Sequence, residues 1–361
     1  MSEEPSVPAS PSAEPAEGDF TSFHTRNFPD LLRGLGISLV VSTYQAGKLI
    51  FARESEGRLN THFRHFASPM GVAFDPPTGR LAVGTRGQVW TFRDHPRVTD
   101  KLDPPGKHDA VFLPRGTHFS GDIRIHEIGW IGEELWAVNT RFSCLCTFDG
   151  ESSFVPRWRP PFISAYAAQD RCHLNGMAIQ DGRIRLVTLL ARTDTQGGWR
   201  EHKKDGGCLW DVAQDRPLAT GLCMPHSPRV HDGRIWLLES GIGSLSVLDE
   251  ATGATTEVIR LPGFTRGLCF AGPYAFVGLS QIRESAIFGG IPIAETGRER
   301  CCGVWAVDLR TGTVAAFLRF EGTVQEIFAV EVLPDIRFPE LLDEPGELLD
   351  SSFVLPPSAM P

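Results

Sequence analysis

The chain has 361 residues and a net charge of −9. This acidic balance argues against nucleic acid or an anionic membrane surface as the main partner, and no run approaches the roughly 18 apolar residues that a membrane helix needs. A hydrophobic content of 41%, with 37 glycines and 27 prolines, favours an all-β protein rich in turns. The eight cysteines lie mostly in or beside apolar strand patterns. Because no export signal accompanies them, we expect reduced thiols in a cytoplasmic protein.

The first 19 residues, MSEEPSVPASPSAEPAEGD, lack the basic and apolar regions of a signal peptide. Their composition predicts a disordered tail. We expect one folded domain over residues 20–345 and a second tail over residues 346–361.

Three strand-like runs, ISLVVSTY, KLIFARES and RLNTHFRHF, follow the tail. Five copies of a repeat come next, each with a polar or apolar channel residue, a short strand, a turn and a second strand. A last run near the C-terminus, QEIFAVEVL, supplies a sixth first strand. Copies about 40 to 60 residues apart predict a β-propeller with four strands in each blade.

The last run has no blade of its own, and the three N-terminal runs have no first strand. We therefore predict a six-bladed β-propeller whose closing blade mixes N- and C-terminal strands. Such a blade ties the two ends of the chain together and removes open sheet edges.

The residue before each first strand is expected to face the central channel. The alignment places six residues in this ring: Met70, His126, Asn175, His226, Arg266 and Glu326. Two imidazoles and a carboxylate suit a divalent metal, either Fe(II), Mn or Zn. We predict His126, His226 and Glu326 as its ligands, with Asn175 as a further ligand. Glu127 is expected to point away, because successive strand residues face opposite sides. The alternative is that these polar groups only hydrogen-bond and organise water in the channel.

Arginines form a second group of candidates. Arg229, Arg266 and Arg141 are predicted to bind a small anionic molecule or a peptide substrate, because guanidinium groups bind carboxylate and phosphate bidentately. Alternatively, each pairs with a neighbouring acid and holds a loop. His173 and Glu239 are the predicted catalytic groups that move the proton.

Long loops at 153–171, 193–207 and 280–300 are expected to roof one mouth of the channel. Trp199 in the second loop is a candidate to stack on the substrate.

Several longer motifs carry a family resemblance: NTRFSCL, SFVPRWRPPF, DRCHLNGMA, GGWR, MPHSPR, LPGFTRGL and GLSQIRES. With them, the chain from about residue 23 to 341 resembles a bacterial family of predicted β-propeller proteins of unknown function. The resemblance implies the fold and no established reaction. The plan is also similar to six-bladed lactonases and strictosidine-synthase-like proteins, whose channel mouth holds a divalent metal or a catalytic acid.

Together these patterns predict a metal-dependent enzyme with its site at the channel mouth. A redox-inert metal would make it a hydrolase or lactonase, and iron would make it a non-haem oxygenase. The competing hypothesis is a non-catalytic recognition module that binds a protein or glycan partner.

Overall fold

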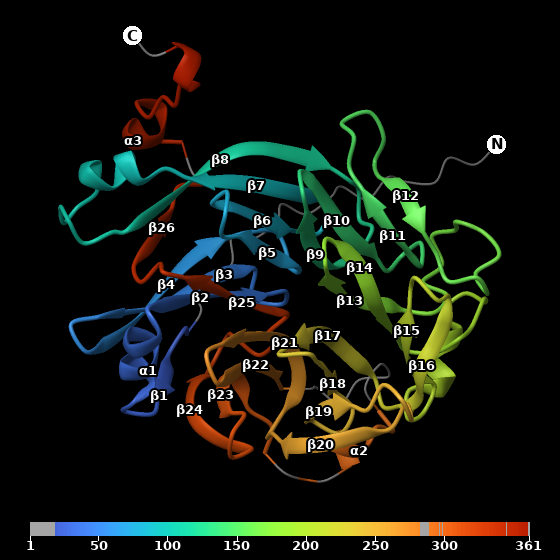
Figure 1. The fold of residues 1–361 in the computed structure, drawn as a ribbon. Helices are drawn as coiled ribbons and strands as arrows, with labels where there is room; N and C mark the ends of the chain where they lie inside the picture. The colour runs from blue at the N-terminus through green and yellow to red at the C-terminus, as the bar shows by residue number, and fades with distance from the viewer. Residues whose placement is uncertain (1–18, 282–288, 296, 298, 344, 360–361) are drawn as a thin grey trace, which may run out of the picture.

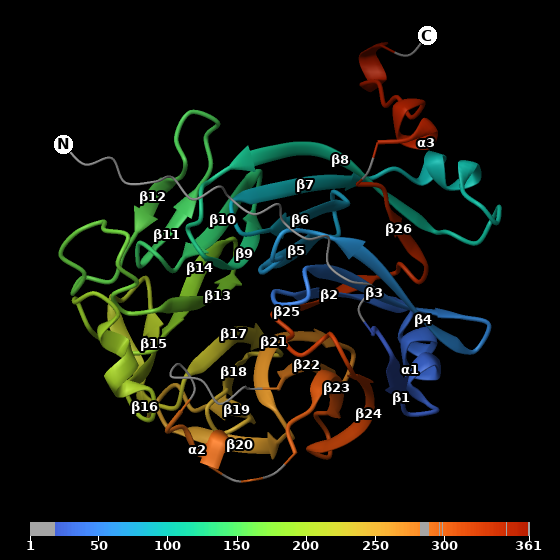
Figure 2. The same cartoon turned by 180° about the vertical axis from the view of Figure 1, so that it is seen from behind.

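Six sheets of mostly antiparallel strands are arranged in a ring in the computed structural model (Figure 1, Figure 2). The structure describes residues 19–281, 289–295, 297, 299–343 and 345–359, so the predicted tail at 1–18 lies outside the described residues. The ring of sheets confirms the predicted all-β, six-bladed propeller. None of the described helices is long and apolar enough to cross a membrane.

Five blades are formed by consecutive strands. Blade 1 contains β5 (Val72–Asp75), β6 (Arg80–Gly84), β7 (Gln88–Asp94) and β8 (Ala110–Phe119). Blade 2 contains β9 (Ile125–Ile131), β10 (Glu134–Asn139), β11 (Cys144–Thr147) and β12 (Val155–Trp158). Blade 3 contains β13 (Leu174–Gln180), β14 (Arg183–Leu189), β15 (Gly207–Asp211) and β16 (Arg216–Leu222). Blade 4 contains β17 (Pro225–His231), β18 (Arg234–Glu239), β19 (Ser244–Leu248) and β20 (Thr255–Arg260). Blade 5 contains β21 (Phe264–Ala271), β22 (Tyr274–Ser280), β23 (Cys302–Asp308) and β24 (Thr313–Phe320).

Blade 6 closes the ring with strands from both ends of the chain. It contains β25 (Ala329–Pro334), β2 (Ile37–Thr43), β3 (Lys48–Ser55) and β4 (Arg58–His65). The C-terminal strand β25 is the innermost and pairs antiparallel with β2, with Val330 opposite Val41. This pairing confirms the predicted mixed blade.

Two short strands extend the closure beyond the prediction. β1 (Ser22–His24) adds an N-terminal edge to β24, and β26 (Pro339–Leu341) pairs in parallel with β8. Each covers an outer sheet edge that would otherwise present unpaired backbone groups.

The remaining short elements lie outside the blades. They are α1 (Phe28–Leu35), α2 (Pro292–Glu295), α3 (Glu347–Asp350) and the 3₁₀ turns at Pro96–Lys101, Gly198–His202 and Pro357–Ala359. α1 begins with Pro29 in its first turn and ends at Gly36, whose φ of 67° is the left-handed conformation that glycine adopts readily. Its apolar face buries Phe28 and Leu32 against blades 5 and 6.

A buried carboxylate on β26 joins blade 6 to blade 1. Glu340 lies 2.6 Å from Arg64 and 2.8 Å from His62, both on β4. Arg53 on β3 and His108, just before β8, are 3.6 and 3.7 Å from its other oxygen. We call these five residues the Glu340 cluster. It holds the C-terminal strand where the two blades meet.

Candidate functional site at the channel mouth

Four of the inner strands carry a β-bulge where they line the channel. In β9 the pairing with β10 shifts between Ile125 and Ile128, so that His126 and Glu127 together oppose one residue of β10. Equivalent shifts lie at Asn175 in β13, at Ser227 and Pro228 in β17, and at Arg266 and Gly267 in β21. A bulge re-aims side chains, and both His126 and Glu127 line the channel cavity. The expectation that Glu127 points away is therefore wrong.

The sixth ring position is held by Phe328. At the end of the second strand in three blades, a hydroxyl group donates to the carbonyl of the residue before the next ring position: Thr140 to Leu174, Ser240 to Thr265 and Ser280 to Ile327. The ring residues that follow these carbonyls are Asn175, Arg266 and Phe328. The alignment that put Glu326 in the ring is thus two residues out of register, because the irregular segment before β25 continues to Phe328.

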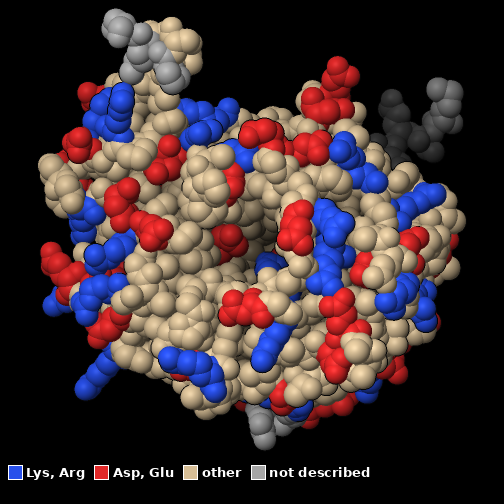
Figure 3. Space-filling model, in the orientation of Figure 1, with Lys and Arg blue, Asp and Glu red and all other residues tan. Residues whose placement is uncertain are grey.

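Two levels of side chains line the channel cavity. We call the lining residues at the start of the inner strands the mouth level (His126, Asn175, His226, Arg266 and Phe328), and those farther along the same strands the inner level (Glu127, Arg229 and Glu331). The space that these side chains line is about 20 Å³, which holds about one water-sized group. Figure 3 shows the face of Figure 1 hollowed at its centre, with acidic and basic side chains at the hollow. Only a small head group of a ligand can therefore enter this space.

Both channel histidines are fixed as the tautomer with a free Nε2. His226 Nδ1 lies 3.0 Å from the Met224 carbonyl oxygen, and His126 Nδ1 lies 3.1 Å from the Arg124 carbonyl oxygen. A carbonyl oxygen only accepts, so each Nδ1 carries the proton and each Nε2 keeps a lone pair. The carbonyls can turn toward the rings because Met224 and Arg124 have left-handed φ values of 50° and 53°. Burial, followed by the charge of Arg266, holds the pKa of both histidines well below 6.5.

We expect the stability of the protein to fall between pH 7.5 and pH 5.5, in part because of His226. Its folded-state pKa is below its unfolded value of 6.5, so the unfolded chain binds more protons below pH 6.5. The contribution of neutral His226 is thus fully present above pH 6.5 and is lost as the pH falls toward the folded-state pKa, at up to about 1.4 kcal/mol per pH unit. Urea unfolding at both pH values tests this. His226→Gln should show a smaller loss than wild type, and the exposed-site control His65→Gln should not. Equal pH dependence in all three proteins would contradict the assignment.

His173 and Asp170 form a hydrogen-bonded pair beside the mouth. Nδ1 of His173 lies 3.0 Å from both carboxylate oxygens of Asp170, and Asp170 also accepts from Arg124 at 3.2 Å. The imidazole ring packs 4.9 Å from that of His126 and 4.3 Å from Trp199. His173 and Asp170 both have left-handed φ values, 51° and 48°. Such backbone conformations are costly outside glycine and occur often at functional sites.

Arg266 is the charged group of the mouth level. Its guanidinium lies 3.6 Å from the centre of the Phe328 ring, and within the described residues no acidic side chain comes close enough to form an ion pair with it. Burial lowers the pKa of Arg266 to about 10, although Glu326, Glu127 and Tyr44 oppose the shift. A buried guanidinium that forms no ion pair is costly.

Arg229 in the inner level is fully paired. It forms an ion pair with Glu127 and donates to the carbonyls of Met177 at 3.2 Å and Pro228 at 2.8 Å. Burial raises the pKa of the neighbouring Glu331 to about 7, with Arg229 opposing that shift. Arg229 thus pairs with a nearby acid, as the alternative interpretation predicts. The substrate-binding role of Arg266 stays a prediction.

Three other predicted residues hold the scaffold. Arg141 pairs with Asp122. Glu239 accepts from the Cys223 backbone N–H at 3.1 Å. Asn175 donates to the Pro225 carbonyl at 3.0 Å and accepts from Thr188 at 2.6 Å. Their polar groups thus form hydrogen bonds or ion pairs with other groups of the protein.

Trp199 is buried, with 3% exposure, and packs on His173 instead of facing solvent. The loops at 153–171 and 193–207 meet, because Arg171 forms an ion pair with Asp194 at 2.6 Å. The third predicted roof loop lies partly outside the described residues, at 282–288.

Sequence reasoning missed Asp170, Tyr44 and Glu331. Asp170 stands three residues before His173, a spacing that could have marked a local acid–imidazole pair. Tyr44 is 42% exposed, and its ring lies 6.2 Å from that of Phe328.

The residues of the mouth do not by themselves complete a divalent-metal site. Imidazoles whose Nδ1 atoms are held by oxygen acceptors are typical metal ligands. However, Glu326 is outside the ring, Asn175 is engaged, and the guanidinium of Arg266 opposes a bare cation. In the described part of the chain, no three His, Cys, Asp or Glu side chains converge to hold a metal ion. The predicted metal stays a prediction.

The fold is a six-bladed β-propeller, and the polar side chains at its channel mouth include the cationic guanidinium of Arg266. The chain belongs to the family described as "Domain of unknown function (DUF4915)", which matches residues 26–342. This membership confirms the resemblance to an uncharacterised propeller family. A search of curated proteins gave no match.

Two solved structures are similar to this chain. A chain from the crystal structure of a nidogen/laminin complex is 10% identical with a TM-score of 0.52, and the match covers 83% of this chain and 99% of that one. A protein of unknown function from Bacteroides caccae is 10% identical with a TM-score of 0.48, covering 82% and 98%. At such low identity the nidogen/laminin match supports the fold alone.

Proposed function

We propose that the channel mouth binds the anionic group of a small molecule, and that Arg266 is its receptor. The observation that carries the proposal is a desolvated guanidinium that forms no ion pair with a described acid, beside two imidazoles whose pKa values are held well below 6.5. A carboxylate oxygen fits the channel space of about 20 Å³. It would accept charge-assisted hydrogen bonds from Arg266, which are among the strongest in proteins.

The bound molecule would then be hydrolysed with His173 as general base. In this mechanism Asp170 holds the Nδ1 proton of His173, and Nε2 takes a proton from a water molecule as that water attacks the carbonyl carbon of an ester or lactone. Nε2 returns the proton to the leaving alkoxide when the C–O bond breaks. An acid–imidazole pair has the same role in other hydrolases, and general base catalysis contributes typically 10²- to 10⁴-fold.

The experiment is a hydrolysis screen of small lactones and esters that carry a carboxylate, with neutral amides of the same compounds as controls. We expect turnover only of the anionic members, and a loss of roughly 10²-fold or more in kcat for His173→Gln with little change in KM. The matched variant His231→Gln, on the rim of blade 4, should keep full activity. Equal turnover of charged and neutral compounds would contradict the role of Arg266.

Two other functions are alternatives to this metal-free hydrolase, and each predicts a different experimental result. Elemental analysis of protein purified without chelator or metal resin tests the metal-dependent version, since near-stoichiometric Fe, Mn or Zn that is lost in His226→Ala would support it. Anion binding without turnover of any compound would instead support a recognition module.

A further inference from the structure

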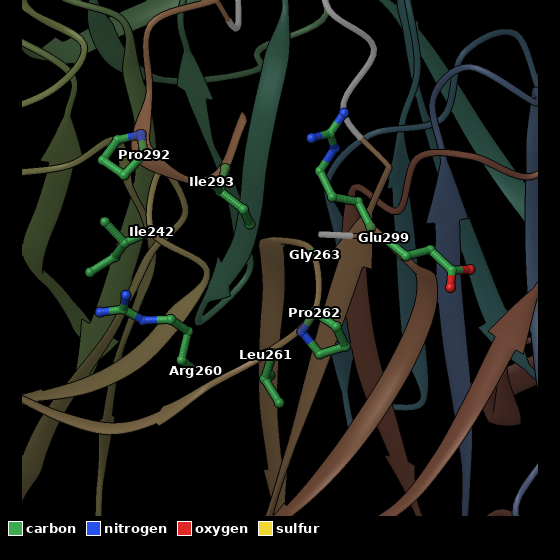
Figure 4. A pocket seen from close by; sticks show the side chains of 9 residues that line it. Ile242, Arg260, Leu261, Pro262, Gly263, Pro292, Ile293 and Glu299 are labelled. Carbon is green, nitrogen blue, oxygen red and sulfur yellow. The ribbon is translucent and has the colours of Figure 1, made fainter. Parts of the chain in front are cut away.

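A second cavity lies between blades 4 and 5, on the face of the molecule where the second strands of the blades end. Its volume is about 490 Å³, within the range of about 300–1,000 Å³ found for small-molecule sites. Most of its wall is apolar and comes from Ile242, Leu261, Pro262, Pro292 and Ile293. Figure 4 shows these side chains around an open space.

The apolar wall is held by the backbone of three segments. Ile293 in α2 donates its backbone N–H to the Gly241 carbonyl at 2.9 Å, and Leu261 donates to the Gly243 carbonyl at 2.8 Å. Cys301 donates to the Pro262 carbonyl at 2.7 Å. The cavity is therefore preformed by the folded blades and α2.

The charges at the rim leave one guanidinium available. Glu299 is engaged by Arg319, and Arg260 is paired with Glu257 at 2.6 Å. Arg300 is half-buried, and among the described residues no hydrogen-bond or ion-pair partner holds its guanidinium. An apolar cavity with one unpaired cation at its rim matches an apolar molecule that ends in a carboxylate.

We propose that this cavity binds an amphipathic carboxylate, with the apolar body against Leu261, Pro262 and Ile293 and the carboxylate on Arg300. The site is distinct from the channel mouth and does not depend on the hydrolase proposal. It adjoins the mouth, however, because Gly241 follows Ser240, whose hydroxyl lies 2.9 Å from Nδ1 of His226.

Calorimetric titration with octanoate and with 1-octanol tests the proposal. Wild type should bind octanoate at least tenfold more tightly than octanol, because one charge-assisted contact is lost with the alcohol. Arg300→Gln should weaken octanoate binding by about tenfold and leave octanol binding unchanged. The control Arg58→Gln, an exposed arginine on β4, should bind octanoate like wild type.

Two further variants test the location. Ile242→Trp should fill the cavity and remove octanoate binding, with Pro292→Phe as a second filling variant if the first unfolds at a lower temperature. Equal affinity for octanoate and octanol, unchanged binding by Arg300→Gln, or full binding by a folded cavity-filling variant would overturn the proposal. So would the absence of any octanoate binding to wild type at millimolar concentration.

Discussion

Arg266→Gln is expected to weaken the binding of small carboxylates by roughly 100-fold without destabilising the fold. The guanidinium lies on Phe328 with no ion-pair partner among the described residues, so its removal breaks no ion pair and relieves a desolvation cost. The lost affinity corresponds to about 1.5–3 kcal/mol for hydrogen bonds to charged groups. Calorimetry with acetate and lactate, and urea unfolding of the same samples, measure the two effects.

Arg229→Gln is the matched control for this prediction. Arg229 lines the same cavity and forms an ion pair with Glu127, so its loss leaves a largely buried carboxylate unpaired and should cost about 3 kcal/mol of stability. If Arg266→Gln destabilised the protein as much as Arg229→Gln and left carboxylate affinity unchanged, Arg266 would be a structural residue.

Glu340→Gln is expected to lower the free energy of unfolding by about 3–5 kcal/mol. The side chain of Glu340 is 10% exposed, and Arg64, His62, Arg53 and His108 surround its carboxylate. Removal of its charge leaves buried cations unpaired and releases β26 from blades 6 and 1. Guanidinium unfolding measures the loss, and Glu347→Gln, on exposed α3, should change stability by less than about 0.5 kcal/mol.

The Glu340 cluster should also make the free energy of unfolding depend on pH in the acid range. Burial alone would raise the pKa of Glu340, but the neighbouring His62 and Arg64 outweigh it and hold the pKa far below its usual value of 4.5. The stabilisation is present above pH 4.5 and is lost as the pH falls toward the folded-state pKa. Wild type and Glu340→Gln should therefore converge in stability at strongly acidic pH. A constant difference down to the acid limit would contradict the role of the carboxylate charge.

The blade count and the mixed closure could be predicted because they depend on repeated strand patterns. The run ISLVVSTY and the last apolar run, QEIFAVEVL, each lacked a partner strand in the predicted blades. The corresponding strands, β2 and β25, pair with each other in the structure. The outer strands β1 and β26 were not predicted, since three residues carry no periodic signal and their pairing depends on tertiary position.

The site was predicted less well, because two features of it break the strand periodicity. The bulge at His126 and Glu127 sends both side chains to the channel, whereas alternation predicts opposite faces. The register of the last blade is set by the hydroxyl of Ser280 on the Ile327 carbonyl, and the apolar run QEIFAVEVL does not encode it. The recurring Ser or Thr at second-strand ends, as in Thr140 and Ser240, is the sequence signal that would have given Phe328 instead of Glu326.

Candidate site residues in the loops were chosen by the chemistry of their side chains, because the sequence does not show where a loop residue lies in the fold. Trp199 was expected at the substrate and instead packs on His173. Such contacts depend on how two long loops meet, and no local pattern encodes them.

The most direct test of the anion site is a crystal of the protein soaked in bromide, with anomalous diffraction recorded at the bromine edge. We predict a peak at the channel mouth within hydrogen-bonding distance of the Arg266 guanidinium, which disappears in Arg266→Gln crystals treated in the same way. No peak at the mouth of the wild type, or an equal peak in the variant, would contradict an anion site built on Arg266.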